Sequence, residues 1–286
     1  MRKFRAFMDL TRIVPNQIMI GIGVLIGEVI ASSGLPPFRE AFLGFLGPFI
    51  LGASTFAMND YCDLEADRRG GRSDRPLVRG DLSRRTAGMV FFVGFPLGLL
   101  LSSLINLRCL GIAVAFALLA LAYNLRLKDT GLPGNLFIAS TMAIPFIYGS
   151  MAIDGIPLPV GVLAMIAFMA GAGRELLKDI MDMEGDEARG SRSLPRTKGI
   201  SAASRLAVVF FLVAVGLSPI PFLLESGGQF HLDLKYLIPV LLTDLMLAWT
   251  AVRTLRLGSP EEAMPLRKTS LVALNLGLLG FLLGSF

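Results

Sequence analysis

The chain has little of what enzyme sites in water usually contain. Its 286 residues include one histidine and two cysteines, and only 17% of them are charged, against roughly 25% in soluble domains. A zinc site therefore lacks ligands. No GxGxxG or GxxxxGK[ST] loop follows a strand pattern, which excludes the common phosphate-binding loops of nucleotide-binding domains. His231 lies far from the acidic segments described below, so we expect it in a solvated loop and exclude histidine acid–base catalysis at those segments.

What the chain has in excess is apolar sequence. Hydrophobic residues make up 53% of it, and the mean hydropathy is +0.65. Apolar stretches of about 17–25 residues, each long enough to cross a hydrocarbon core as a helix, recur along the whole chain. The sequence therefore predicts an all-α integral membrane protein with nine transmembrane helices, forming a single polytopic domain over residues 1–286. The predicted spans are 13–31, 40–58, 86–104, 109–125, 134–152, 159–177, 203–224, 236–252 and 269–286.

The basic residues predict how the protein is oriented in the membrane. With a cytoplasmic N-terminus, 24 of the 27 lysines and arginines fall on the cytoplasmic side, and only Arg39, Arg108 and Lys235 fall outside. We therefore expect a multi-pass protein of the cell membrane whose N-terminus and active-site loops face the cytoplasm. The net charge of +5 then reflects this topology and does not indicate nucleic-acid binding. Cys62 and Cys109 are expected at opposite faces of the membrane, which argues against a disulfide between them.

Two acidic clusters, Asn59–Asp67 and Glu175–Asp186, each follow a long apolar segment. Carboxylates beside a bilayer cost free energy, so such a concentration of them indicates a functional site. At helical spacing, the polar residues of each cluster share one face of their helix. The residues of these two stripes are Asn59, Asp63 and Asp67 in the first cluster, and Glu175, Asp179, Asp182 and Asp186 in the second.

The segments that follow the two clusters resemble each other. Residues 59–85 and 178–202 are the longest non-apolar stretches, and each passes from acidic to basic residues and then to a proline, Pro76 or Pro195. Four predicted helices separate the two cluster ends, which keeps both clusters on the same side of the membrane. We therefore predict two parallel four-helix halves plus a ninth helix.

The two clusters hold carboxylates that repel one another strongly unless cations lie between them. Oxygen ligands favour Mg²⁺, which binds a few carboxylates together with substrate phosphate. The pattern therefore indicates a site that removes diphosphate from a hydrocarbon chain with an allylic carbon, and aromatic faces can stabilise the resulting cation. The carboxylates are Asp60, Asp63, Asp67, Glu175, Asp179, Asp182 and Asp186. The basic side chains expected to donate to the diphosphate are Arg68, Arg72, Arg75, Arg79, Lys128 and Lys178. The candidate aromatic faces are Tyr61, Tyr123, Phe137 and Tyr148, although packing is the commoner role of such residues.

The chain resembles the UbiA superfamily of intramembrane prenyltransferases over nearly its whole length. The first motif is Asn59-Asp60-x-x-Asp63-x-x-x-Asp67, followed by Asp74-Arg75-Pro76-Leu77-x-x-Gly80. The second is Asp179-x-x-Asp182-x-x-x-Asp186, with Gly190 and Ser193 after it. Further matching residues are Arg12 and Asn16, where the chain enters the first helix, and Tyr123, Lys128 and Asn135 in a pattern after the fourth. Two spaced acidic motifs in the expected helices of a nine-helix protein form a specific combination.

The resemblance implies a Mg²⁺-dependent prenyltransferase. It implies that Asn59, Asp63 and Asp67, with the aspartates of the second motif, hold Mg²⁺ against a prenyl diphosphate, and that Arg72 and Lys128 contact the diphosphate. Weaker expectations for substrate contacts concern Arg12, Asn16, Tyr123, Asn135 and Glu175.

Within the superfamily, the segment from Arg174 to Asp186 looks most like that of the archaeal-type digeranylgeranylglyceryl phosphate synthases. Those enzymes join geranylgeranyl diphosphate to the free hydroxyl of geranylgeranylglyceryl phosphate. Prenyltransferases with aromatic acceptors, such as 4-hydroxybenzoate, often have aspartate where this chain has Glu175. The expected partners are thus a prenyl diphosphate, a lipid-phosphate acceptor and the bilayer, and no protein partner can be inferred.

Two other hypotheses remain at this point. An aromatic acceptor is the alternative within the same reaction class. A cation transporter is the alternative outside it, because carboxylates within a membrane protein also line ion pathways. Transporter sites, however, lie near the midplane between inverted repeats, whereas these clusters lie at helix ends and the apparent repeat is parallel.

Overall fold

The computed structural model describes residues 2–286, apart from the side chains of Leu125, Ala188 and Arg189, and the regular structure of this range is helical. The long helices are α2 (Ile18–Ser32), α3 (Phe38–Arg69), α4 (Arg84–Ile105), α5 (Leu107–Ala122), α6 (Leu132–Ile153), α7 (Leu158–Met181), α10 (Ile200–Leu217), α12 (Leu234–Leu255) and α13 (Ala263–Leu283). The short elements are α1 (Arg2–Thr11), η1 (Ile13–Gln17), η2 (Tyr123–Leu127), α8 (Met183–Arg189), α9 (Leu194–Lys198), α11 (Ile220–Leu223), η3 (Glu225–Phe230) and η4 (Pro260–Glu262).

Eight helical segments of the described chain are long and apolar enough to cross a membrane. Their outward faces carry apolar side chains that a water-soluble surface seldom exposes, such as Phe92 (72% exposed) and Leu245 (68%). The predicted span over 109–125 differs from the others, because α5 has only 16 residues. The π-helical turn η2 continues α5 for five more residues, so the two together reach about 30 Å, the thickness of a hydrocarbon core.

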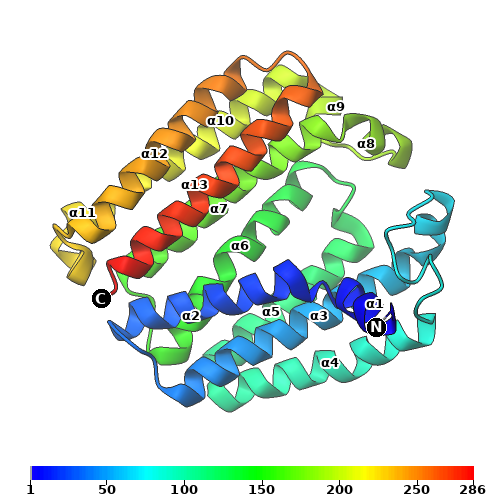
Figure 1. Ribbon diagram of the computed structural model, residues 1–286, viewed down its shortest axis with the longest axis horizontal. Coiled ribbons are helices and arrows are strands. Elements are labelled where there is room, and N and C mark those ends of the chain that lie inside the picture. Colours follow the sequence, from blue (N-terminus) through cyan, green and yellow to red (C-terminus); the bar gives the residue numbers. More distant parts are fainter. Residues whose placement is uncertain (1) are drawn as a thin grey trace.

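The loops after α3 and α7 lie at the same end of the bundle, which we call the motif end. Figure 1 shows α8, α9, α1 and the N-terminus gathered there, on the right, while α11 and the C-terminus lie at the opposite end. Ion pairs from Arg2 to Asp81 and from Arg79 to Asp9 hold α1 against the loop that follows α3. The prediction that both acidic clusters share one side of the bundle is therefore confirmed.

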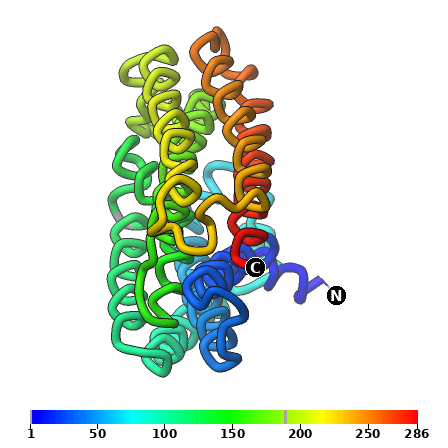
Figure 2. Tube along the Cα trace, turned by 90° about the vertical axis from the view of Figure 1, so that its left-hand side faces the viewer, coloured from blue at the N-terminus to red at the C-terminus, as the bar shows by residue number. Residues whose placement is uncertain are grey.

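Long-range packing brings the first and last long helices together and joins the early helices to the later ones. Figure 2 shows α13 meeting α2 on one side of the bundle. On another side α2 crosses α6 very closely, because a Cβ atom on Gly149 would collide with the carbonyl oxygen of Val24 and one on Gly27 with that of Phe146. Small residues permit such close crossings of membrane helices. The helices thereby surround a central space that opens toward the motif end.

The length of α3 explains where the first acidic cluster lies. Its 32 residues extend about 48 Å, well beyond a hydrocarbon core of about 30 Å. The apolar part from Phe38 to Met58 is enough to span that core, so the helix continues past it and carries Asn59–Asp67 into the polar region. The cluster is therefore a rigid helical extension of a membrane span.

Candidate active site

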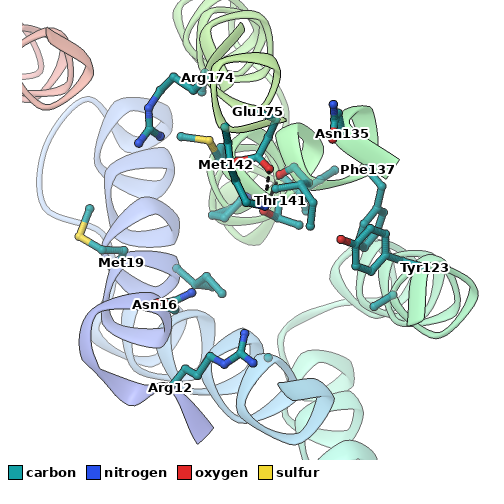
Figure 3. A pocket seen from close by; sticks show the side chains of 18 of the residues that line it. Arg12, Asn16, Met19, Tyr123, Asn135, Phe137, Thr141, Met142, Arg174 and Glu175 are labelled. Carbon is teal, nitrogen blue, oxygen red and sulfur yellow. Dashed lines mark hydrogen bonds and ion pairs between the residues drawn. The ribbon is translucent and has the colours of Figure 1, made fainter. Parts of the chain in front are cut away.

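A cavity of about 1230 Å³ lies inside the bundle and opens at the motif end. It exceeds the roughly 300–1,000 Å³ of pockets that hold drug-sized molecules, so it has room for large substrates. Its walls come from η1, α2, α3, α5, η2, α6, α7, α12 and α13, and Figure 3 shows several of its side chains. The predicted site residues that line it are Arg12, Asn16, Asn59, Asp63, Asp67, Arg72, Arg75, Tyr123, Lys128, Asn135, Glu175, Lys178, Asp179, Asp182 and Asp186.

The first motif is oriented by a hydrogen-bonded network at the cavity wall. Asn59 donates to Asp63 Oδ2 at 3.1 Å and to Asn124 Oδ1 at 2.9 Å, and Lys128 Nζ donates to Asp63 Oδ1 at 2.6 Å. Asn124 and Lys128 reach Asn59 and Asp63 from η2 and the residue that follows it. The Lys128 ammonium partly offsets the charge of Asp63 and places a phosphate donor beside the motif.

Asp60 faces away from the cavity, contrary to its predicted role as a metal ligand. It follows Asn59 directly, and a helix turns about 100° per residue, so its side chain points away from that of Asn59. The Asp60 carboxylate is only 2% exposed and accepts hydrogen bonds from Arg12 at 3.2 Å and Arg75 at 3.1 Å. Asp60 therefore positions two arginines that line the cavity, and burial is the main cause that lowers the pKa of Arg12, followed by repulsion from Arg75.

Arg68, which we predicted to bind diphosphate, also lies outside the cavity. Its side chain is exposed, pairs with Glu65 at 3.0 Å one turn earlier, and does not line the cavity. Arg72 does line it and is held by two hydrogen bonds to Asp74, at 2.8 and 2.9 Å. Those bonds lower the pKa of Asp74 to about 2, so this carboxylate stays ionised at any working pH.

The second motif is divided between two helices, whereas we predicted one continuous stripe. Helix α7 ends at Met181, Asp182 has non-helical dihedral angles (φ −97°, ψ 16°), and α8 carries Asp186. Asp179 accepts a hydrogen bond from Asn135 Nδ2 at 2.6 Å, and Asp186 is buried with its backbone carbonyl accepting from Arg196 at 3.1 Å. The break changes the direction of the chain between Asp179 and Asp186.

Glu175 and Lys178 form an ion pair of 3.3 Å on α7, next to the second motif. Aromatic rings also line the cavity: Tyr123 stacks on Phe137 with ring centroids 4.9 Å apart, and Phe137 stacks on Phe116 at 5.5 Å. The other predicted aromatic faces differ. Tyr148 lines the cavity, but Tyr61 does not and lies instead under the Arg84 guanidinium, 4.4 Å from its ring centroid.

The donor set fits Mg²⁺ bound together with a diphosphate. No three Asp, Glu, His or Cys side chains of the described residues are grouped closely enough to form a metal cage by themselves. Mg²⁺ does not need such a cage, because it keeps waters and binds one or two carboxylates plus substrate phosphates. Oxygen ligands from α3 on one wall and from α7 and α8 on the other match that mode of binding.

The profile of the UbiA prenyltransferase family matches residues 20–284, almost the entire chain. The chain belongs to the UbiA prenyltransferase family. The digeranylgeranylglyceryl phosphate synthase of Archaeoglobus fulgidus is 43% identical over 286 residues, with 100% of this chain and 97% of that protein covered.

Solved structures agree with this assignment. A structure concerning digeranylgeranylglyceryl phosphate synthase in membranes superposes with a TM-score of 0.87 at 31% identity, covering 100% of this chain and 99% of that one. A UbiA homolog from Archaeoglobus fulgidus bound to GPP and Mg²⁺ has the same fold, with a TM-score of 0.66 at 19% identity and coverage of 96% and 99%. The predicted all-α membrane fold and prenyltransferase class are confirmed.

The structure adds residues that the sequence reasoning did not assign to the site. Asn124 accepts a hydrogen bond from Asn59. It directly follows Tyr123, one of the residues that match the family pattern, and this position is the sequence feature that could have identified it. Arg174 and Arg267 also line the cavity. They are far apart in the sequence, and no local pattern connects them.

Proposed function

We propose that this protein transfers a geranylgeranyl group from geranylgeranyl diphosphate to the free hydroxyl of geranylgeranylglyceryl phosphate, in archaeal ether-lipid synthesis. The bond between the allylic carbon and the diphosphate breaks, a bond from the acceptor oxygen to that carbon forms, and diphosphate and the hydroxyl proton are released. The observation that carries the proposal is a single large apolar cavity whose mouth is lined by both acidic motifs. The 43% identity to a digeranylgeranylglyceryl phosphate synthase over the full chain supports this choice of substrates.

The residues at the cavity mouth have distinct proposed roles. Asn59, Asp63 and Asp67 from α3, with Asp179, Asp182 and Asp186 from the second motif, hold Mg²⁺. Bound Mg²⁺ supplies the positive charge that stabilises the departing diphosphate. Arg72, Arg75 and Lys128 donate to the diphosphate oxygens, and Asp60 and Asp74 keep the two arginines in place. Lys178, paired with Glu175, adds a donor on the α7 side.

The interior of the cavity protects the reactive carbon. Its apolar walls exclude water, which would otherwise add to an allylic cation in place of the acceptor. The stacked faces of Tyr123 and Phe137 lie beside the mouth and can stabilise that cation. The lipid chains occupy the remaining volume between the helices.

Labelled geranylgeranyl diphosphate tests this function. The purified protein is incubated with Mg²⁺ and either geranylgeranylglyceryl phosphate or 4-hydroxybenzoate, and the products are separated by chromatography. We expect a diether phosphate product from the first mixture only, its loss on chelation by EDTA and its recovery when Mg²⁺ is restored. Product from the aromatic acceptor alone contradicts the proposed acceptor, and full activity in EDTA contradicts the role of the metal.

We further propose that the motif end faces the cytoplasm, as the distribution of lysine and arginine predicts. In a Cys62→Ser background, Ser73→Cys places an exposed thiol in the loop after α3, and Ser226→Cys places one at the opposite end, in η3. A membrane-impermeant maleimide should label Ser73→Cys only in inside-out vesicles and Ser226→Cys only in right-side-out vesicles. The reverse pattern contradicts the orientation.

A further inference from the structure

Two arginines that line the cavity have no partner in the part of the chain that the structure describes. Arg174 lies on α7 and Arg267 on α13, two helices that pack against each other. Among the described residues, neither guanidinium forms a hydrogen bond or ion pair, and the Nε atom of each is buried without an acceptor. The other basic side chains at the cavity are held by carboxylates: Arg12 and Arg75 by Asp60, Arg72 by Asp74, Lys128 by Asp63, and Lys178 by Glu175.

Such an arrangement is unfavourable unless an anion completes it. Arg174 and Arg267 carry like charges and line the same cavity from two helices that pack against each other. Glu175, the carboxylate beside them, is engaged by Lys178. Burying a guanidinium donor without an acceptor costs free energy, and two of them beside one another raise the cost. A phosphate oxygen is the acceptor that the planar guanidinium fits best.

The position of the pair separates it from the cations of the first motif. Arg174 precedes Lys178 by one helical turn, so it lies about 6 Å further from the motif end. In Figure 3 its side chain extends from α7 toward α2, on the other side of the cavity from Tyr123 and Phe137. An anion bound there does not compete with a diphosphate held by Arg72, Arg75 and Lys128.

The surroundings of the pair suit the head of a lipid. Below Arg267, α13 presents Leu271, Leu274 and Leu278 to the cavity, and Met19 of α2 lies on the facing wall. Leu271 and Met19 are 45% and 44% exposed, so neither side chain is packed against protein on all sides. A molecule with a phosphate on the two arginines therefore has an apolar path for a hydrocarbon chain.

We propose that Arg174 and Arg267 bind the phosphomonoester of the lipid acceptor and so select a phosphorylated acceptor over a neutral one. A phosphomonoester carries close to two negative charges at neutral pH, which matches two guanidinium groups, whereas a phosphodiester carries one. The identity of the lipid rests on the function proposed above, while the preference for a phosphomonoester rests on the arginine pair.

Binding in the absence of donor and Mg²⁺ tests this inference. Dissociation constants of geranylgeranylglyceryl phosphate and of its dephosphorylated alcohol are measured with the full-length protein in detergent. We expect the wild type to prefer the phosphorylated lipid by roughly 10- to 100-fold, the usual effect of charge-assisted hydrogen bonds. Arg174→Gln and Arg267→Gln should each remove most of this preference. Lys268→Gln, which changes the neighbouring exposed cation of α13, is the matched control and should leave it unchanged.

The outcomes separate the two proposals. An unchanged preference in both glutamine variants, with thermal midpoints near that of the wild type, overturns the arginine site. Should a glutamine variant not fold, Arg174→Met and Arg267→Met remove the charge but keep a long unbranched side chain, and an unchanged preference in both overturns the site equally. Competition by a phosphodiester lipid at the same concentration as the acceptor contradicts the preference for a phosphomonoester. An arginine-dependent preference without any prenyl transfer refutes the proposed function and leaves the binding site standing.

Discussion

Replacing Asp63 or Asp182 with alanine is expected to lower prenyl transfer by at least about 100- to 1000-fold, the usual loss when a group that stabilises transition-state charge is removed. The two residues lie on opposite walls of the cavity, on α3 and at the junction of α7 and α8. Each alone cannot hold a metal-bound diphosphate in place, so neither should compensate for loss of the other. Release of labelled diphosphate at saturating substrate measures the effect.

Glu65→Ala is the matched control for this experiment. Glu65 lies on α3 between Asp63 and Asp67, but it is exposed, pairs with Arg68 and does not line the cavity. We expect this variant to keep activity close to that of the wild type. Size-exclusion profiles and thermal midpoints should match for all three variants. Normal turnover in both Asp63→Ala and Asp182→Ala would refute the proposed role of the motifs.

Replacing Asp60 with alanine is expected to destabilise the protein by about 3–5 kcal/mol, because it leaves buried charge uncompensated. Asp60 is almost fully buried and is the shared acceptor of Arg12 and Arg75. Its loss removes the ion pair of Arg12 and the shortest ion pair of Arg75, and leaves two guanidinium groups close together. The free energy of unfolding in detergent, or the shift in thermal midpoint, measures the effect.

Asp74→Ala is the control that distinguishes the loss of a buried ion pair from the loss of an exposed one. Asp74 also pairs with an arginine, Arg72, but the pair is exposed and should contribute only about 0–1 kcal/mol. A small change in stability for Asp74→Ala with a large one for Asp60→Ala supports the positioning role of Asp60. Unchanged stability of Asp60→Ala together with a raised Mg²⁺ concentration for half-maximal activity would instead restore Asp60 as a metal ligand.

The spacing of the first motif did not predict the positions of Asp60 and Arg68. Both belong to the run of charged residues that carries the motif, and composition alone does not distinguish them from Asp63 and Arg72. Helical periodicity groups Asn59, Asp63 and Asp67 on one face, and the structure places these three at the cavity as expected. The residues that pack on the other faces of α3 depend on how α1 and the loop after α3 fold, and local spacing specifies neither.

The backbone of the second motif was likewise not predicted from spacing. The spacing of Glu175, Asp179, Asp182 and Asp186 is compatible with a continuous helix, and that was our prediction. The helix breaks at Asp182, and the segment after it packs through Arg196 onto Asp186 and Ser191. Tertiary contacts of this kind override a local periodicity that would otherwise continue.

The sequence by itself determined the membrane class, the apolar helical segments, the two acidic motifs and the oxygen-rich side chains of the proposed metal site. These features are local: hydropathy and a period of 3.6 residues are properties of a single helix and need no knowledge of its neighbours. Only the tertiary structure decided that Asp60 accepts from two arginines, that η2 and the residue after it supply Asn124 and Lys128 to the first motif, and that Arg174 and Arg267 line one cavity without a partner among the described residues. Those relations join residues up to 93 positions apart, and they arise because helix packing, which depends on all side chains at once, sets the distances between faces.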